Sequence, residues 1–150
     1  MRDPREGIRR DLELLLNTRH GLLVTRSRLE ERWRAGAAAQ ARAQICAVDD
    51  VPDELPEVRG SILCYGIPDV CGVYVSDHRA LETLRRAIQA TIERHETRLA
   101  NVQVRIEPSE TNPLRVCFRI EGRIRADGFR GAISLDTVLD LGAGKFLMKE

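Results

Sequence analysis

The sequence predicts an α+β fold in which an N-terminal helix and one long helix pack on a C-terminal antiparallel β-meander. Apolar residues recur at three- and four-residue steps near the N-terminus and again over residues 77–95, which is the period of a helix with one buried face. After residue 99 the apolar residues alternate with polar ones, which is the period of a half-buried strand. Helices followed by a run of strands are typical of α+β domains.

The first helix is predicted over residues 8–17. Four of its apolar residues share one face: Ile8, Leu12, Leu15 and Leu16. Leu14 widens this stripe, so we expect the helix to bury more than one side. The polar run Asn17-Thr18-Arg19 marks its end.

The chain of 150 residues fits a single domain. Residues 26–59 are predicted to form a variable surface excursion from it. Within this segment, residues 49–57 hold two prolines and five acidic residues, a composition typical of an exposed connector.

The segment Tyr65-Gly66-Ile67-Pro68-Asp69 predicts a structured turn. Pro68 keeps the preceding residue out of the helical region, and Gly66 permits backbone geometry closed to other residues. Ser76 or Asp77 is then expected to cap the long helix, which runs to about His95. Its apolar stripe consists of Leu81, Leu84, Ile88 and Ile92.

Three strands are predicted in the last third of the chain. They cover residues 102–106, 114–124 and 133–139, and in each the apolar residues occupy alternate positions. One face of the sheet is therefore expected to be apolar, with Leu114 among its residues, and the other charged.

The charge balance gives no bulk attraction to nucleic acid or to an anionic membrane, because 24 basic and 23 acidic residues leave a net charge of +1. Five arginines gather on the charged sheet face: Arg105, Arg115, Arg119, Arg123 and Arg125. Acidic residues interrupt them and aromatic stacking residues are absent, so a partner protein suits this face better than nucleic acid. No run of about 18 apolar residues predicts membrane insertion.

The four cysteines, Cys46, Cys64, Cys71 and Cys117, form no CxxC motif. Free thiols in a reducing cytoplasm are the economical interpretation. We expect no metal, since no complete ligand set is apparent, and no cofactor, since the glycines match no phosphate-binding motif.

Catalysis is not predicted by any residue pattern. A lysozyme-like hydrolase needs two carboxylates flanking a cleft, and nothing in the sequence places two acids around one. Cys64 or Cys71 paired with a histidine lacks the surroundings of an activated nucleophile. Hydrolysis of peptidoglycan remains an alternative of another class, and no small-molecule substrate is expected.

Glu96-Thr97-Arg98 follows the long helix. Residues two apart do not share a face of a helix. At a helix end, however, Glu96 and Arg98 can both reach outward or form ion pairs with another subunit. The plain alternative is a solvated helix terminus, which spacing alone favours.

Two motifs carry a family resemblance. The first is Arg10-Asp11-Leu12-Glu13-x-Leu15-Leu16-Asn17-Thr18-Arg19, and the second is Ser61 followed by Tyr65-Gly66-Ile67-Pro68-Asp69. Together with the order of helices and strands, they resemble the lysozyme-like baseplate wedge family. Contractile-tailed phages share this family with type VI secretion systems, whose wedge subunits are called TssE. The resemblance covers most of the chain except roughly residues 26–59.

The resemblance implies a cytoplasmic structural protein, with other baseplate wedge subunits and the contractile sheath protein as its partners. The family has a Glu-Pro-Arg motif after its long helix, and Glu96 and Arg98 match its acid and base while Thr97 replaces the proline. The resemblance implies that Glu96 and Arg98 join the subunit to neighbouring wedge proteins. It also implies that sheath strands extend an edge of the sheet. A wedge of a phage tail or another contractile particle is the alternative within the same family.

Overall fold

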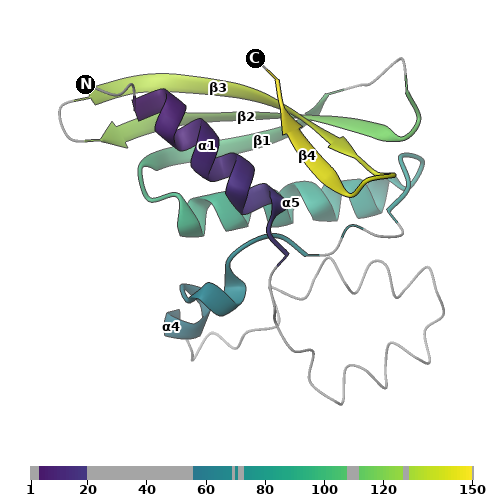
Figure 1. Cartoon of the computed structure of the whole chain (residues 1–150), viewed down its shortest axis with the longest axis horizontal. Coiled ribbons are helices and arrows are strands. Elements are labelled where there is room, and N and C mark those ends of the chain that lie inside the picture. Colours follow the sequence, from purple (N-terminus) through teal and green to yellow (C-terminus); the bar gives the residue numbers. More distant parts are fainter. Residues whose placement is uncertain are drawn as a thin grey trace.

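A computed structural model of the chain describes residues 4–19, 56–68, 70, 73–107, 112–126 and 129–149. Its elements, in chain order, are α1 (Pro4–Asn17), α4 (Pro56–Arg59), the 3₁₀ helix η1 (Ile62–Cys64), α5 (His78–His95), β1 (Leu99–Glu107), β2 (Arg115–Ala126), β3 (Phe129–Asp140) and β4 (Lys145–Met148). The predicted α+β fold is confirmed (Figure 1). Most of the predicted excursion lies outside the described residues, as do Cys46, Asp69 and Cys71.

The strands form one antiparallel sheet in the order β1-β2-β3-β4. The predicted three-strand meander was therefore incomplete, because β4 adds a fourth strand. Its four residues are too few for an alternating pattern to stand out in the sequence. β4 pairs with β3 from Thr137↔Met148 to Asp140↔Lys145.

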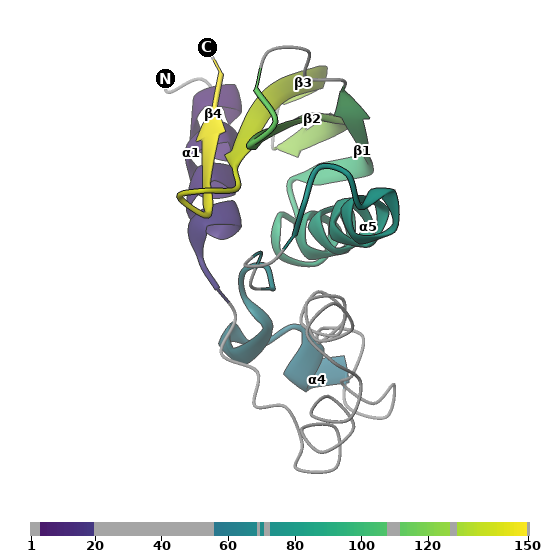
Figure 2. The same ribbon diagram turned by 90° about the vertical axis from the view of Figure 1, so that its right-hand side faces the viewer.

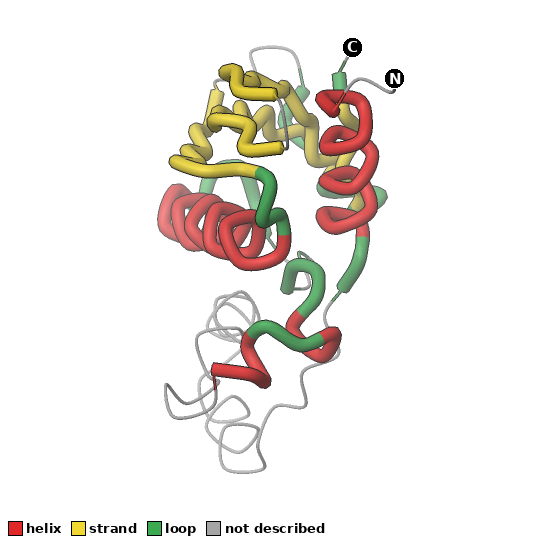
Figure 3. Tube along the Cα trace, turned by 90° about the vertical axis from the view of Figure 1, so that its left-hand side faces the viewer, coloured by secondary structure: helices red, strands yellow, loops and turns green. Residues whose placement is uncertain are grey.

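Two helices cover the apolar face of the sheet at its opposite ends. Helix α5 contacts β1, whereas α1 contacts β4 and β3. Figure 2 shows α1 beside β4 and α5 below β1, and Figure 3 shows both helices against the strands from the other side. The largest side chains buried between these layers are Phe118, Phe146, Ile8, Leu12, Leu16, Ile67, Leu84, Ile88, Ile92, Ile120 and Ile124.

Two predictions of burial were wrong. Leu14 is 62% exposed and Leu114 is 58% exposed. Helix α1 buries only Ile8, Leu12, Leu15 and Leu16, because the sheet lies along one of its sides. Leu114 precedes the first residue of β2, Arg115, and so falls outside the alternation.

The long helix begins as predicted. Asp77 is its N-cap, and its side chain accepts a hydrogen bond from the backbone N–H of Ala80. Such a cap satisfies one of the free N–H groups of the first turn. No helix in the described part of the chain is long and apolar enough to cross a membrane.

Candidate functional site

Glu96 and Arg98 lie side by side in the tight turn between α5 and β1. The Glu96 Oε1 atom accepts hydrogen bonds from Nε of Arg98 at 2.7 Å and from the Arg98 backbone N–H at 3.2 Å. Nη2 of Arg98 also pairs with Oε2 of Glu96. Glu96 is only 5% exposed, so this two-pronged pairing compensates a carboxylate that has lost most of its water.

Asp11 of α1 joins the same cluster. Its Oδ2 atom lies 2.6 Å from Nη2 of Arg98. A Cβ atom added to Gly7, one helical turn earlier, would lie 3.7 Å from Nη1 of Arg98. The hydrogen bonds that Arg98 donates to Glu96 raise the pKa of the Arg98 guanidinium, and the one to Asp11 adds to the effect. Arg98 thereby ties α1 to the junction of α5 and β1.

The predicted turn lies against this cluster. Burial raises the pKa of the Tyr65 hydroxyl, and the charges of Asp11 and Glu96 raise it further. The Tyr65 ring meets the ring of His95 edge-on, with 5.3 Å between centroids. Nε2 of His95 lies 3.0 Å from the Cys64 carbonyl oxygen. The turn is therefore held to the last residue of α5.

These contacts correct one expectation and leave another as a prediction. A solvated helix terminus is wrong for Glu96, which is buried and paired within its own chain. The acid and the base meet although Thr97, not proline, stands between them. A contact of either residue with another subunit stays a prediction. Nη1 of Arg98 has no hydrogen-bond partner among the described residues, and the side chain is 37% exposed.

The Asn17-Thr18-Arg19 motif joins three parts of the chain at the end of α1. Asn17 donates a hydrogen bond to the Phe146 carbonyl oxygen and accepts one from the Phe146 N–H, both at 2.9 Å. The Thr18 carbonyl accepts from the N–H of Ile67 at 2.9 Å. Arg19 donates to the carbonyl oxygens of Leu16 and Gly144.

The second motif receives these contacts. Arg19 and Ile67 form an isolated parallel bridge, and Ile67 is fully buried. Gly66 has φ of 108°, a conformation that glycine adopts without strain. Pro68, which follows Ile67 in the chain, is also buried. Both sequence motifs are thus parts of one junction between α1, β4 and the turn.

The charged sheet face is an array of ion pairs. Nε of Arg119 lies 2.8 Å from Oδ1 of Asp136, and Nη1 of Arg119 lies 3.4 Å from Oε1 of Glu107. Arg115 lies 3.4 Å from Asp140. The hydrogen bond from Arg119 lowers the pKa of Asp136. These carboxylates balance the charge of Arg115 and Arg119, and the absence of nucleic-acid binding stays a prediction.

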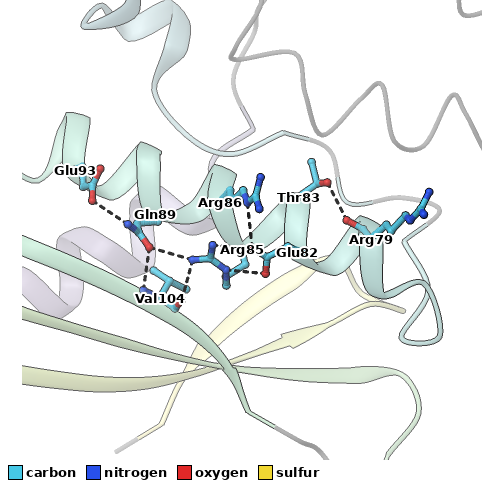
Figure 4. Close-up of polar contacts among 8 residues, drawn as sticks. All are labelled: Arg79, Glu82, Thr83, Arg85, Arg86, Gln89, Glu93 and Val104. Atoms are coloured by element: carbon cyan, nitrogen blue, oxygen red, sulfur yellow. Dashed lines mark hydrogen bonds and ion pairs between the residues drawn. The ribbon is translucent and has the colours of Figure 1, made fainter.

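Sequence reasoning missed a polar network between α5 and the outer edge of β1. Arg85 Nη1 donates to the Val104 carbonyl oxygen at 3.1 Å, and Oε1 of Gln89 accepts from the Val104 N–H at 3.3 Å. Glu82 holds Arg85 through two hydrogen bonds of 2.8 and 2.9 Å (Figure 4). Spacing along α5 placed these side chains on its polar face, but no sequence signal linked them to a strand.

Two of the four cysteines, Cys64 and Cys117, lie in the described part of the chain. Cys64 is buried and free, and Cys117 is half-buried and free. Among the described residues, no three histidine, cysteine, aspartate or glutamate side chains are grouped so that they could hold a metal ion.

The comparisons with known proteins point the same way as the two motifs. Residues 2–128 match the family model described as baseplate wedge protein gp25, a family that includes TssE. No curated protein and no solved structure matches. The matched span includes α1, the turn, α5, β1 and β2. The chain belongs to the family of the baseplate wedge protein gp25.

Proposed function

We propose that this chain is a structural wedge subunit of a type VI secretion baseplate, which joins other wedge subunits to the contractile sheath and templates the first sheath strands. Membership of the wedge family supports baseplate components as partners. The observation that carries the sheath role is the incomplete pairing of β3 among the described residues. β4 pairs only with Thr137 to Asp140, whereas β3 begins at Phe129.

The hydrogen-bond register identifies which backbone groups of β3 face the side where β4 lies. Lys149 donates to the Asp136 carbonyl oxygen at 2.8 Å. Residues in an antiparallel strand alternate in the neighbour they bond. The backbone groups of Arg130, Ala132 and Ser134 therefore point to the same side as those of Asp136. All three residues are exposed, and no described strand pairs with them on that side.

An extended strand from the sheath protein would complete this edge by continuing the line of β4. Main-chain hydrogen bonds supply much of the affinity in strand addition. A preformed sheet spares the incoming strand part of the cost of ordering. Small side chains at Gly131, Ala132 and Ser134 leave room for the approach.

Arg98 is the residue that we propose contacts a neighbouring wedge subunit. Its Nη2 and Nε atoms are occupied by Asp11 and Glu96; among the described residues, nothing accepts from the two N–H groups of Nη1, which we propose donate to a neighbouring subunit. Glu96 does not contact the partner itself, because its side chain is only 6% exposed. Glu96 thus positions the arginine that meets the partner.

The role proposed is architectural, in the cytoplasm, within a baseplate docked at the membrane. It requires no hydrolysis, and Glu96, the most buried carboxylate of the turn, is held by Arg98 in an ion pair. The same wedge role in a phage tail or another contractile particle predicts different sheath and wedge partners in the pull-down described next.

The test is a pull-down of the tagged full chain from its native cell, with partners identified by mass spectrometry. Ser134→Pro removes an outward N–H without touching the β2–β3 ladder, so we expect loss of sheath protein and retention of wedge subunits. Arg98→Ala is expected to lose wedge subunits. Ser134→Ala and Arg79→Ala, at exposed positions, are the matched controls and should keep both partners.

Thermal unfolding shows that each variant is folded before its partners are compared. Undiminished sheath recovery with Ser134→Pro contradicts strand addition at this edge. Undiminished wedge recovery with folded Arg98→Ala contradicts the role of Arg98. Recovery of phage tail components in place of secretion components assigns the chain to the alternative particle.

A further inference from the structure

The sheet has a second edge, the free side of β1. In the described part of the chain, β1 has β2 as its one partner strand. An exposed edge strand is a template for pairing with another chain. The proposed strand addition at β3 therefore raises the question of why the incoming strand, or a second copy of this chain, does not pair with β1.

The outward backbone groups at the centre of β1 are already occupied. Alternate residues of an edge strand turn their N–H and C=O away from the sheet. Val104 is such a residue, since its N–H bonds Gln89 and its C=O bonds Arg85, both on α5. A new strand can gain hydrogen bonds there only by displacing both side chains.

The two side chains are held in place by their neighbours on α5. Nη1 of Arg85 donates to Oε1 of Gln89 at 3.1 Å, and Nε2 of Gln89 donates to Oε1 of Glu93 at 3.1 Å. Glu82 accepts from Arg85 and from Arg86. Figure 4 shows this chain of contacts running along the helix above Val104. The side chain of Arg85 is 22% exposed, so most of it is removed from water at this edge.

A second feature acts on the same edge. The register of β1 against β2 shifts between Ala100 and Gln103, and Asn101 in this bulge has φ of 54°. A bulge bends its strand and interrupts regular pairing, and natural sheets use bulges to protect their edges. The bulge interrupts the first half of β1, and the α5 side chains occupy its centre.

We propose that Arg85 and Gln89 are edge caps that close β1 to strand addition, so that this subunit accepts a strand only at the opposite edge of its sheet. The direction of sheath growth would then follow from the subunit itself. Without the caps, β1 would pair with β1 of a second copy. The closing of β1 is inferred from the contacts of Arg85 and Gln89 alone. Only its consequence for the direction of sheath growth rests on the proposed function.

The test compares Arg85→Ala/Gln89→Ala with His78→Ala/Arg79→Ala. The control removes one arginine and one polar residue from exposed positions of the same helix, and among the described residues no side-chain hydrogen bond joins either of them to Arg85, Gln89 or Val104. We expect the cap variant to self-associate in sedimentation velocity at concentrations where the wild type and the control do not. We also expect its Val104 amide hydrogen to exchange about tenfold faster in the monomer at low concentration.

The experiment tests the caps in the absence of sheath protein. A negative result is therefore distinguishable from a failure of strand addition at β3. A folded cap variant with unchanged self-association contradicts the proposal, even if Val104 exchanges faster, because the caps would then only satisfy hydrogen bonds. Should the double variant not fold, Gln89→Ala alone decides. It must show faster Val104 exchange and some self-association, and the absence of either overturns the proposal.

Discussion

At the scale of single residues, the family motifs act through side chains that reach distant backbone. Asn17 is the clearest case, because one amide group binds both the N–H and the C=O of Phe146. Phe146 is 1% exposed, and its ring lies 6.1 Å from that of Phe118. Asn17 therefore positions a strand that brings a core side chain into place.

We predict that Asn17→Ala lowers the free energy of unfolding by about 1–3 kcal/mol, because it leaves a half-buried donor and acceptor without partners. Asn17→Asp keeps the acceptor for the Phe146 N–H but places a second acceptor oxygen against the Phe146 carbonyl, so it should not restore the lost stability. Urea denaturation measures both changes. Glu13→Ala, on the exposed side of the same helix, should stay within about 0.5 kcal/mol of the wild type. Equal effects of Asn17→Ala and Glu13→Ala would contradict this role.

At the scale of elements, α5 makes three connections along its length. Its apolar stripe enters the core, its polar face caps β1, and its last residue, His95, holds the Tyr65 turn. Burial lowers the pKa of His95; the hydrogen bond with the Cys64 carbonyl raises it, and the charge of Arg94 lowers it further. The net effect is that the folded chain favours the neutral imidazole.

This lowered pKa predicts a loss of stability on mild acidification. A histidine whose pKa is lowered on folding contributes its full stability above its unfolded value of 6.5, and loses it as the pH falls below that value. We expect the free energy of unfolding from urea curves to fall between pH 7.5 and pH 5.5, a range of about one unit on either side of the unfolded pKa of histidine. His95→Gln, which keeps a side-chain donor for the Cys64 carbonyl, should flatten this dependence, and an unchanged slope would exclude His95 as its source.

At the scale of the whole molecule, the sheet separates two kinds of surface. The helices cover one face, which holds Phe118 and Ile120. The other face carries cross-strand ion pairs, such as that between Arg119 and Asp136. Hydrophobic burial dominates folding, whereas exposed ion pairs contribute little. Stability should therefore reside on the helix-covered face.

Neighbouring residues of β2 test this separation directly. Phe118→Ala is expected to cost about 3–5 kcal/mol, because it removes a fully buried aromatic side chain and leaves a cavity. Arg119→Ala should leave the unfolding midpoint nearly unchanged at physiological salt. Guanidinium denaturation of both variants provides the comparison, and a larger loss for Arg119→Ala would contradict the assignment of the faces.

Much of the fold was predictable because periodicity records which side of an element is buried. The stripes of α1 and α5, the Asp77 cap and the alternation in β1 to β3 were all visible in the sequence. β4 was not, because a four-residue strand is defined by pairing with β3 and by contact with Asn17. Leu14 was misplaced because an apolar side chain is buried only where another element covers it.

The candidate site shows the same division. Sequence singled out Glu96 and Arg98, but residue spacing could not show that Asp11, 87 positions away from Arg98, completes the cluster. Nor could it show that Arg85 and Gln89 reach Val104. From sequence alone, a side chain on the polar face of a helix is expected to be solvated. Its contact with a strand becomes visible only when the position of that strand is known.

By itself, the sequence determined the family, the α+β class and the apolar faces, because motifs and periodicity depend on residues near one another in the chain. Only the tertiary structure decided that Glu96 lies buried under Arg98, that Asn17 holds β4, and that Arg85 and Gln89 bond the outer edge of β1, while in the described part of the chain β4 pairs with only one end of β3. The physical reason is that hydrogen bonds and burial depend on distances in space between segments that the chain brings together only on folding.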